Sequence, residues 1–308
     1  MVRYYTVQPD EAGERIDTFL ARKTAISRSQ IQRLILKKNV LVNEKQISQN
    51  FRIRTADIVS VTITDQHVEV LRPEALDLPI LYKDYYIVVV DKPAGMVVYP
   101  AAGHRSGTLM NALSYYSEKL ATVGMPLRPG VVHRIDKETS GVMIVAVDDT
   151  AYYDLVEQFR QRMITRNYIA LIYGTMRGEK GEIISKIGRS ESDRKKMSTR
   201  VRRGKDAITR WKVLQKFHGA TMLEIKLSTG RTHQIRVHFA AEGHPLLGDR
   251  TYGRVKEIRG KKRSIYFPRQ MLHAAVLGFT HPSTGKYMEF SSPLPADMQA
   301  AVKELRGE

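Results

Sequence analysis

The chain has 308 residues, of which 42% are hydrophobic and 27% are charged, so it has the composition of an ordinary globular protein. It contains no cysteine, which excludes disulfide bonds, cysteine nucleophiles and thiolate-bound zinc and fits a reducing compartment. No apolar run approaches the roughly 18 residues of a membrane-spanning helix, and the N-terminus lacks the apolar centre of a signal peptide. We therefore expect a cytoplasmic protein without a membrane partner.

The formal net charge of +18 indicates a polyanionic partner. Self-repulsion of this size is tolerated most easily when a polyanion neutralises it. Nucleic acid is favoured over an anionic membrane, because no basic amphipathic helix with exposed Trp or Phe is evident. Solubility alone is the alternative explanation, but a net charge of about 2–8 is enough for that in a small domain.

Residues 13–62 predict a small unit with the order helix, helix, strand, turn, strand. Apolar residues recur at helical spacing in 16–20 and again in 31–35. Two β-type runs follow, at 40–42 and 58–63. The outward face of the second helix is basic and supplies three candidate RNA-binding residues, Arg28, Arg33 and Lys37. The alternative is a solvated helix face.

The remaining chain predicts a linker and a large domain. Residues 65–79 lose periodicity and contain two prolines. We expect a small α/β RNA-binding domain over 1–64, the linker over 65–79 and a catalytic domain over 80–308. A helix is predicted at 151–163, and strand-like alternation recurs in three runs: 168–173, 209–214 and 222–227. The fold class expected for the large domain is α+β, a large mixed, mostly antiparallel sheet with flanking helices.

A polar loop at residues 133–141, His-Arg-Ile-Asp-Lys-Glu-Thr-Ser-Gly, lies between two apolar β-type runs. Asp136 is therefore presented on a tight loop at the edge of a strand, with Arg134 two residues before it. A rigid scaffold that holds a loop carboxylate beside a cation is a common way to build a catalytic group.

A second polar run, 228–238, predicts a turn at Thr229-Gly230 followed by a strand. Alternation would put Ile235, Val237 and Phe239 on one face and Gln234, Arg236 and His238 on the other. Arg231 lies at the turn, where it could bind a carboxylate or a phosphate with both arms of its guanidinium. An ordinary polar face of an edge strand is the alternative reading.

These motifs resemble those of the RluA/RluD family of RNA pseudouridine synthases. Residues 133–141 closely resemble the catalytic-loop signature, with Ile135 where the family usually has Leu. Residues 229–236, Thr-Gly-Arg-Thr-His-Gln-Ile-Arg, resemble a second family segment. Residues 91–100 also match, although Tyr99 replaces the usual His, and 168–174 resemble the segment with an active-site tyrosine.

The resemblance implies a cofactor-free isomerase and assigns roles to residues. Asp136 is the expected catalytic carboxylate, and we expect Arg231 to be the cation that keeps it ionised while water is excluded. Arg134 is expected to fill the stack that an extruded uridine leaves. Tyr168 is expected to stack on the uracil or to transfer a proton at its carbon 5. Phosphate contacts are expected from Lys195, in the basic stretch 189–205, and from Arg236.

Residues 14–20, 27–31 and 40–45 resemble the RNA-binding domain first seen in ribosomal protein S-four. The likeness covers about 50 residues, with Asn39 where glycine is usual and Ala56-Asp57 where Gly-Asp is usual. It implies that Arg28, Arg33 and Lys37 contact RNA. By analogy, it favours large ribosomal RNA over tRNA as the partner of a monomeric enzyme.

Two other functions were weighed. A metallohydrolase needs converging histidines and carboxylates, but His233 and His238 are five apart on a probable strand and should face opposite ways. No metal site is therefore expected. A non-catalytic RNA-binding factor in ribosome assembly is the other rival, and the intact set of Asp136, Tyr168 and Arg231 argues against it.

Overall fold

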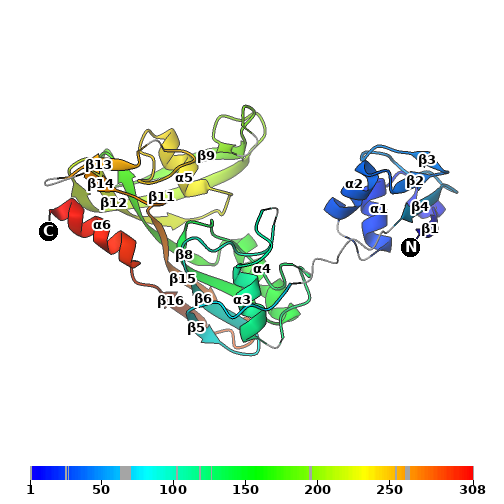
Figure 1. The fold of residues 1–308 in the computed structure, drawn as a ribbon, viewed down its shortest axis with the longest axis horizontal. Coiled ribbons are helices and arrows are strands. Elements are labelled where there is room, and N and C mark those ends of the chain that lie inside the picture. The colour runs from blue at the N-terminus through cyan, green and yellow to red at the C-terminus, as the bar shows by residue number, and fades with distance from the viewer. Residues whose placement is uncertain are drawn as a thin grey trace. The chain divides into compact units, whose positions relative to one another are not determined.

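The computed structural model describes residues 2–24, 26, 28–62, 71–101, 103–117, 119–125, 127–193, 196–253, 255–260 and 264–307. The chain divides into two compact units, Met1–Val70 and Leu71–Glu308 (Figure 1). Each unit has its own core, so the two are described separately.

The small unit is a two-helix, four-strand domain. Its sheet is antiparallel with the strand order β1-β4-β2-β3. The elements are β1 (Val2–Thr6), a 3-10 helix (Pro9–Glu11), α1 (Ile16–Lys23), α2 (Arg28–Leu36), β2 (Val40–Val42), β3 (Lys45–Gln46) and β4 (Ile58–Thr62). Apolar residues at helical spacing, among them Ile16, Phe19 and Ile31, are fully buried against Val59 and Val61. The predicted order of helices and strands is confirmed, and β1 and β3 are additional strands.

The large unit is built on a ten-stranded sheet with the order β10-β9-β11-β12-β8-β15-β7-β6-β5, in which β16 also pairs with β15. The contact between β15 and β7 is parallel, and the other strand pairings in the described part of this sheet are antiparallel. The strands are β5 (Ile80–Lys83), β6 (Ile87–Lys92), β7 (Ser140–Ala146), β8 (Thr165–Tyr173), β9 (Lys180–Arg189), β10 (Met197–Ser198), β11 (Lys205–Phe217), β12 (Ala220–Leu227), β15 (Leu272–Thr280) and β16 (Tyr287–Ser291). This confirms the predicted mixed, mostly antiparallel sheet.

Helices and a short hairpin complete the large unit. They are α3 (Leu109–Tyr116), α4 (Asp149–Gln161), α5 (Gln234–Ala241), α6 (Ala296–Arg306) and the hairpin β13 (Glu257–Arg259) with β14 (Ser264–Tyr266). α4 begins two residues before the predicted helix at 151–163, because the Asp148 carboxylate caps it by accepting hydrogen bonds from the backbone N–H groups of Thr150 and Ala151.

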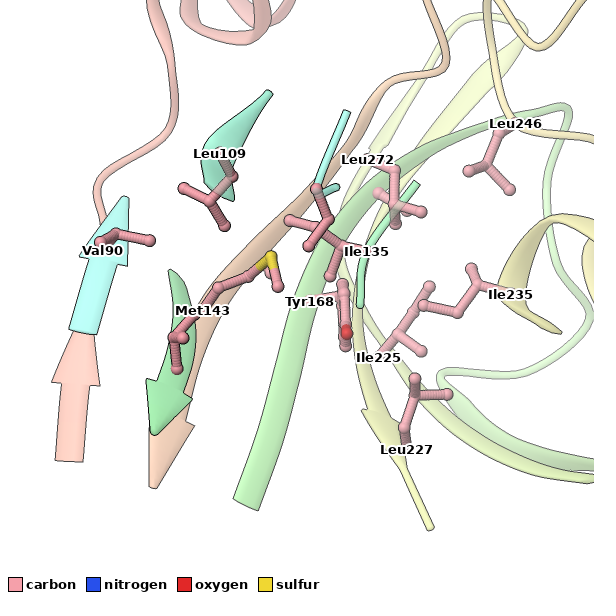
Figure 2. Packing of buried hydrophobic residues seen from close by; sticks show 14 of the residues in the cluster. Val90, Leu109, Ile135, Met143, Tyr168, Ile225, Leu227, Ile235, Leu246 and Leu272 are labelled. Atoms are coloured by element: carbon pink, nitrogen blue, oxygen red, sulfur yellow. The ribbon is translucent and has the colours of Figure 1, made fainter. Parts of the chain in front are cut away.

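Strand β7 positions the polar loop that precedes it. All seven of its residues are buried, because alternate side chains enter different clusters. Met143 packs in the cluster drawn in Figure 2, whereas Val142 and Ile144 pack in a second cluster with Ile87. A strand covered on both faces reads as a continuous apolar run. The start of β7 is therefore fixed, and so is the end of the loop at residues 133–139.

Residues 71–79, part of the predicted linker, contact the large unit. Leu78 is buried in the large core and Leu76 packs against it. Asn111 donates its side-chain amide to the carbonyl of Arg72 at 2.7 Å. The part of the predicted linker at 65–70 lies outside the described residues.

Candidate active site

The loop that carries Asp136 is anchored on both sides of that residue. Ile135 is buried in the large core beside Tyr168 (Figure 2). On the other side, the fully buried Lys92 donates to the Lys137 carbonyl at 3.1 Å and also to two carbonyls of its own turn. The Asp136 side chain keeps 17% of its surface exposed. The fold therefore presents this carboxylate in a fixed position, shielded from most of the solvent.

Asp136 is paired with Arg236. The arginine Nη1 donates to Asp136 Oδ2 at 2.8 Å, while its Nε and Nη2 donate to Asp249 at 2.7 and 2.9 Å. The Arg236 guanidinium also lies 5.1 Å from the ring centroid of Tyr252. Burial lowers the pKa of Arg236, but hydrogen bonds and charge from Asp249, followed by the charge of Asp136, raise it overall. Arg236 is therefore a permanent cation between two carboxylates.

The segment around Arg236 is helix α5, so the predicted strand is wrong. Gln234 to Phe239 are all buried. A helix buried on every side has no exposed polar face, so its sequence does not show the 3.6-residue periodicity that predicts a helix. His233, just before the helix, has a φ of +56°. This left-handed conformation breaks the extended path expected from the alternation. It also puts Arg236 in the interior, where this residue, predicted to contact RNA, forms ion pairs with Asp136 and Asp249.

Arg231 does not form the predicted contact with Asp136. Its Nε donates to the Asp206 carbonyl at 2.9 Å. The turn is fixed by Gln234, whose side-chain oxygen accepts from Arg231 N at 3.0 Å and from the Thr229 hydroxyl at 2.8 Å. Arg236, five residues further along, takes the place beside the carboxylate that the sequence analysis gave to Arg231.

His233 and Tyr252 complete the surroundings of Asp136. His233 Nε2 lies 3.7 Å from Asp136 Oδ1, and its Nδ1 hydrogen-bonds with the Tyr252 hydroxyl at 2.7 Å. That hydroxyl also accepts from Met197 N at 2.9 Å. Burial lowers the pKa of His233 against the opposing charge of Asp136, so the imidazole is neutral at pH 7.

A pocket of about 580 Å³ opens beside Asp136. It is lined by residues from the segments 97–104, 134–138, 248–251 and 268–270, together with His233 and Arg236. Its size suits a ligand of nucleotide dimensions. Arg134 is exposed at this pocket, and its Nη1 donates to the Tyr99 hydroxyl at 3.3 Å. A carboxylate, a neutral imidazole and a fixed guanidinium therefore meet at one opening.

The comparisons with known proteins agree with this geometry. The family model for RNA pseudouridylate synthase matches residues 86–241, and that for the S4 domain matches residues 14–59. The chain belongs to the RNA pseudouridine synthase family. The Bacillus subtilis protein named "Uncharacterized RNA pseudouridine synthase YlyB" is 43% identical over 98% of this chain and 97% of its own length.

Two further relatives of this synthase extend the comparison. The "Ribosomal large subunit pseudouridine synthase D" of Zymomonas mobilis is 40% identical over 97% of this chain and 96% of its own. The solved structure of Human RNA Pseudouridylate Synthase Domain Containing 1 is 27% identical and superposes with a TM-score of 0.58. It covers 76% of this chain and 97% of its own. The chain is thus an isomerase of the RluA family with an N-terminal S4 domain that binds RNA.

The other predicted residues of the synthase lie in different places. Tyr168 is buried in β8 beside Ile135, and burial raises the pKa of its hydroxyl. Lys195 lies outside the described residues. In the small unit, Arg33 is exposed on α2 and Lys37 is exposed in the turn that follows α2, whereas Arg28 is bound at 3.1 Å to the fully buried Asp17.

Three residues beside Asp136 had no predicted role: Asp249, Tyr252 and His233. Asp249 and Tyr252 could not be assigned from the sequence, because their partners Arg236 and His233 reach them through tertiary contacts. No group of three or more His, Asp or Glu that could hold a metal occurs within the described ranges. In the same ranges, no helix is long and apolar enough to cross a membrane.

Proposed function

We propose that this synthase converts uridines of large-subunit ribosomal RNA to pseudouridine, with Asp136 as the catalytic carboxylate. The observation that carries this proposal is the Asp136–Arg236 ion pair, held at the edge of the pocket by a loop anchored on both sides. A fixed cation beside a carboxylate stabilises its negative charge while a substrate excludes water.

The reaction breaks the bond between ribose C1′ and uracil N1, turns the base and joins C1′ to C5. Asp136 acts as nucleophile at C1′ or at C6, or it stabilises a glycal route. In each case the hydrogen on C5 leaves as a proton after the new bond forms, and N1 gains one. No electron is gained or lost overall, so no redox partner takes part.

Arg134 and Tyr168 have supporting roles in this proposal. A uridine in folded RNA must leave its stack, at a cost of a few kcal/mol. Arg134, exposed beside the pocket, inserts where the base was. Tyr168, next to Ile135 in the core (Figure 2), faces the turned uracil and handles the C5 proton.

Ribosomal RNA is supported as the substrate by two observations. Relatives from Zymomonas mobilis and Nitrosomonas europaea, 40% and 39% identical, are named ribosomal large subunit pseudouridine synthase D. The net charge of +18 and the S4 domain suit a large folded RNA.

The test is tritium release from unmodified large-subunit ribosomal RNA labelled at uridine C5. The wild-type protein should release tritium, Asp136→Asn should release none, and both should bind the RNA with equal affinity. Asp77→Asn, at an exposed position of the same unit, is the matched control and should behave as wild type. Release by D136N would remove the catalytic role of Asp136. If wild type releases tritium from tRNA and not from ribosomal RNA, the substrate is tRNA.

A further inference from the structure

Three arginines are buried in the described part of the large unit, and one of them differs from the others. Arg236 and Arg269 are each bound through two nitrogens to a carboxylate, Asp249 and Asp297. Arg166, 8% exposed, makes no hydrogen bond or ion pair with any described residue, and its Nε is buried without a partner. A guanidinium held out of water without a counter-charge is strongly unfavourable. Arg166 is therefore the one of these three arginines that no carboxylate of a described residue neutralises.

An exposed turn lies directly over Arg166. A Cβ atom added to Gly230 would lie 2.7 Å from Arg166 Nη1. Because glycine has no side chain, there is room at this position for the Arg166 guanidinium. Below it, Arg166 Cζ lies 5.5 Å from the ring centroid of Phe159. Gly230 is exposed, so an anion can approach the guanidinium past this turn without crossing the core.

Arg231 brings a second guanidinium to the same place. Its Nε donates to a backbone carbonyl, and its two terminal nitrogens make no hydrogen bond with a described residue. After burial, the charge of Arg231 is the cause that lowers the pKa of Arg166, so the two cations repel each other. The guanidinium groups of Arg166 and Arg231 have no carboxylate partner among the described residues, and the donor geometry of a guanidinium matches the oxygens of a phosphate group.

We propose that Arg166 and Arg231 bind a phosphodiester group of the RNA strand that carries the target uridine. This inference rests on the proposed function for its substrate. Arg166 and Tyr168 are two residues apart on β8 and share one face of the strand. The turn with Arg231 leads into α5, whose Arg236 holds Asp136. The phosphate therefore belongs to the nucleotide at Asp136 or to its neighbour.

Two variants of the full-length chain separate charge from access. Arg166→Met removes the guanidinium and keeps an apolar stem of similar length. Gly230→Ala keeps both arginines but places a methyl group against Arg166 Nη1. Arg160→Met is the matched control, because Arg160 is exposed on α4 and paired with Glu157. The probes are inorganic phosphate at constant ionic strength, read by melting temperature, and the salt dependence of binding to unmodified large-subunit ribosomal RNA.

Phosphate should raise the melting temperature of wild type and R160M by roughly 2 °C, and that of R166M and G230A by much less. Without phosphate, R166M should melt above wild type, because an unpaired buried charge is gone. The slope of log Kd against log salt should fall by about 0.7–0.9 in R166M, as expected for one phosphate contact.

Equal phosphate responses and equal salt slopes in R166M and wild type would overturn the site. A different result tests the proposed function: it is contradicted if wild type releases no tritium from ribosomal RNA. An Arg166-dependent phosphate response in such a protein would still support the anion site.

Discussion

Asp136 accepts a hydrogen bond from Arg236 at 2.8 Å, and that arginine is itself clamped by Asp249 through two bonds of 2.7 and 2.9 Å. Asp249 is fully buried in its side chain, so it cannot exchange Arg236 for water. Asp249 therefore fixes the orientation of the Arg236 guanidinium, and with it the direction in which Nη1 donates to Asp136. The position of the Asp136 carboxylate depends on this second carboxylate, which does not line the pocket.

Replacing Arg236 with lysine should remove most activity although the charge remains. An ammonium is a compact donor and cannot serve both carboxylates with the geometry of a planar fork. Tritium release should fall on the order of 10²-fold. The free energy of unfolding, measured with urea, should fall by about 3 kcal/mol because a buried ion pair is broken. Arg210→Lys, in an exposed pair with Glu182, should change neither. Wild-type rates in R236K would show that charge alone is sufficient at this position.

The sequence predicted the elements whose periodicity is one-sided or whose caps are local. This applies to the helices α1, α2 and α4. The strand β7 was also predicted, because its run of apolar residues is complete within the strand itself. The helix α5 was missed because it is buried on all sides. A short apolar alternation there matches a strand and a buried helix equally well.

The candidate site was predicted in the same uneven way. Asp136 could be chosen from its loop alone, since a polar loop between two buried runs is local information. The cation beside it could not, because Arg231 and Arg236 flank a left-handed residue, His233, that redirects the chain. Asp249 has no local signature, because its role arises from contact with α5.

Removing the Tyr252 hydroxyl should slow the reaction without weakening RNA binding. The hydroxyl joins His233 Nδ1 to Met197 N, and a phenylalanine would keep the ring beneath Arg236. Tyr252→Phe should lose about 1 kcal/mol of stability and about tenfold in tritium release at saturating RNA. Tyr287→Phe, an exposed tyrosine on β16, controls for loss of a hydroxyl. A change in RNA affinity without a change in rate would contradict a positioning role.

The acid limb of stability should be shallower in His133→Gln than in wild type. His133 Nε2 accepts from Ile144 N at 3.1 Å, and burial, followed by the charge of Arg166, lowers the pKa of His133 to about 3. An unfolded histidine titrates near pH 6.5. As pH falls below that value, the unfolded chain takes up a proton that the folded chain refuses, so stability falls. The stability of the folded form is therefore complete above the unfolded pKa and is lost toward pH 3.

Glutamine keeps an acceptor oxygen near the place of Nε2 but has no such titration. Between roughly pH 6 and 4, wild type should lose about 1.4 kcal/mol more per pH unit than H133Q. Urea unfolding at several pH values measures the difference. The buried His238, with a pKa lowered to about 4, is present in both proteins and cancels. His218→Gln, at an exposed position, is the matched control for loss of a histidine. Parallel acid limbs in H133Q and wild type would contradict a His133 that stays neutral in the folded protein.

The exposed surface of α2 and of the turn that follows it should supply part of the salt-dependent affinity for RNA. Arg33 and Lys37 are exposed and form no ion pair with a described residue, whereas Arg28 is engaged by Asp17. The double variant Arg33→Gln with Lys37→Gln should reduce the slope of log Kd against log salt by about 1.5, for two lost phosphate contacts. Arg3→Gln with Arg54→Gln removes the same charge from exposed positions outside α2. If both pairs reduce the slope equally, the small unit attracts RNA through diffuse charge, and α2 is not the contact face.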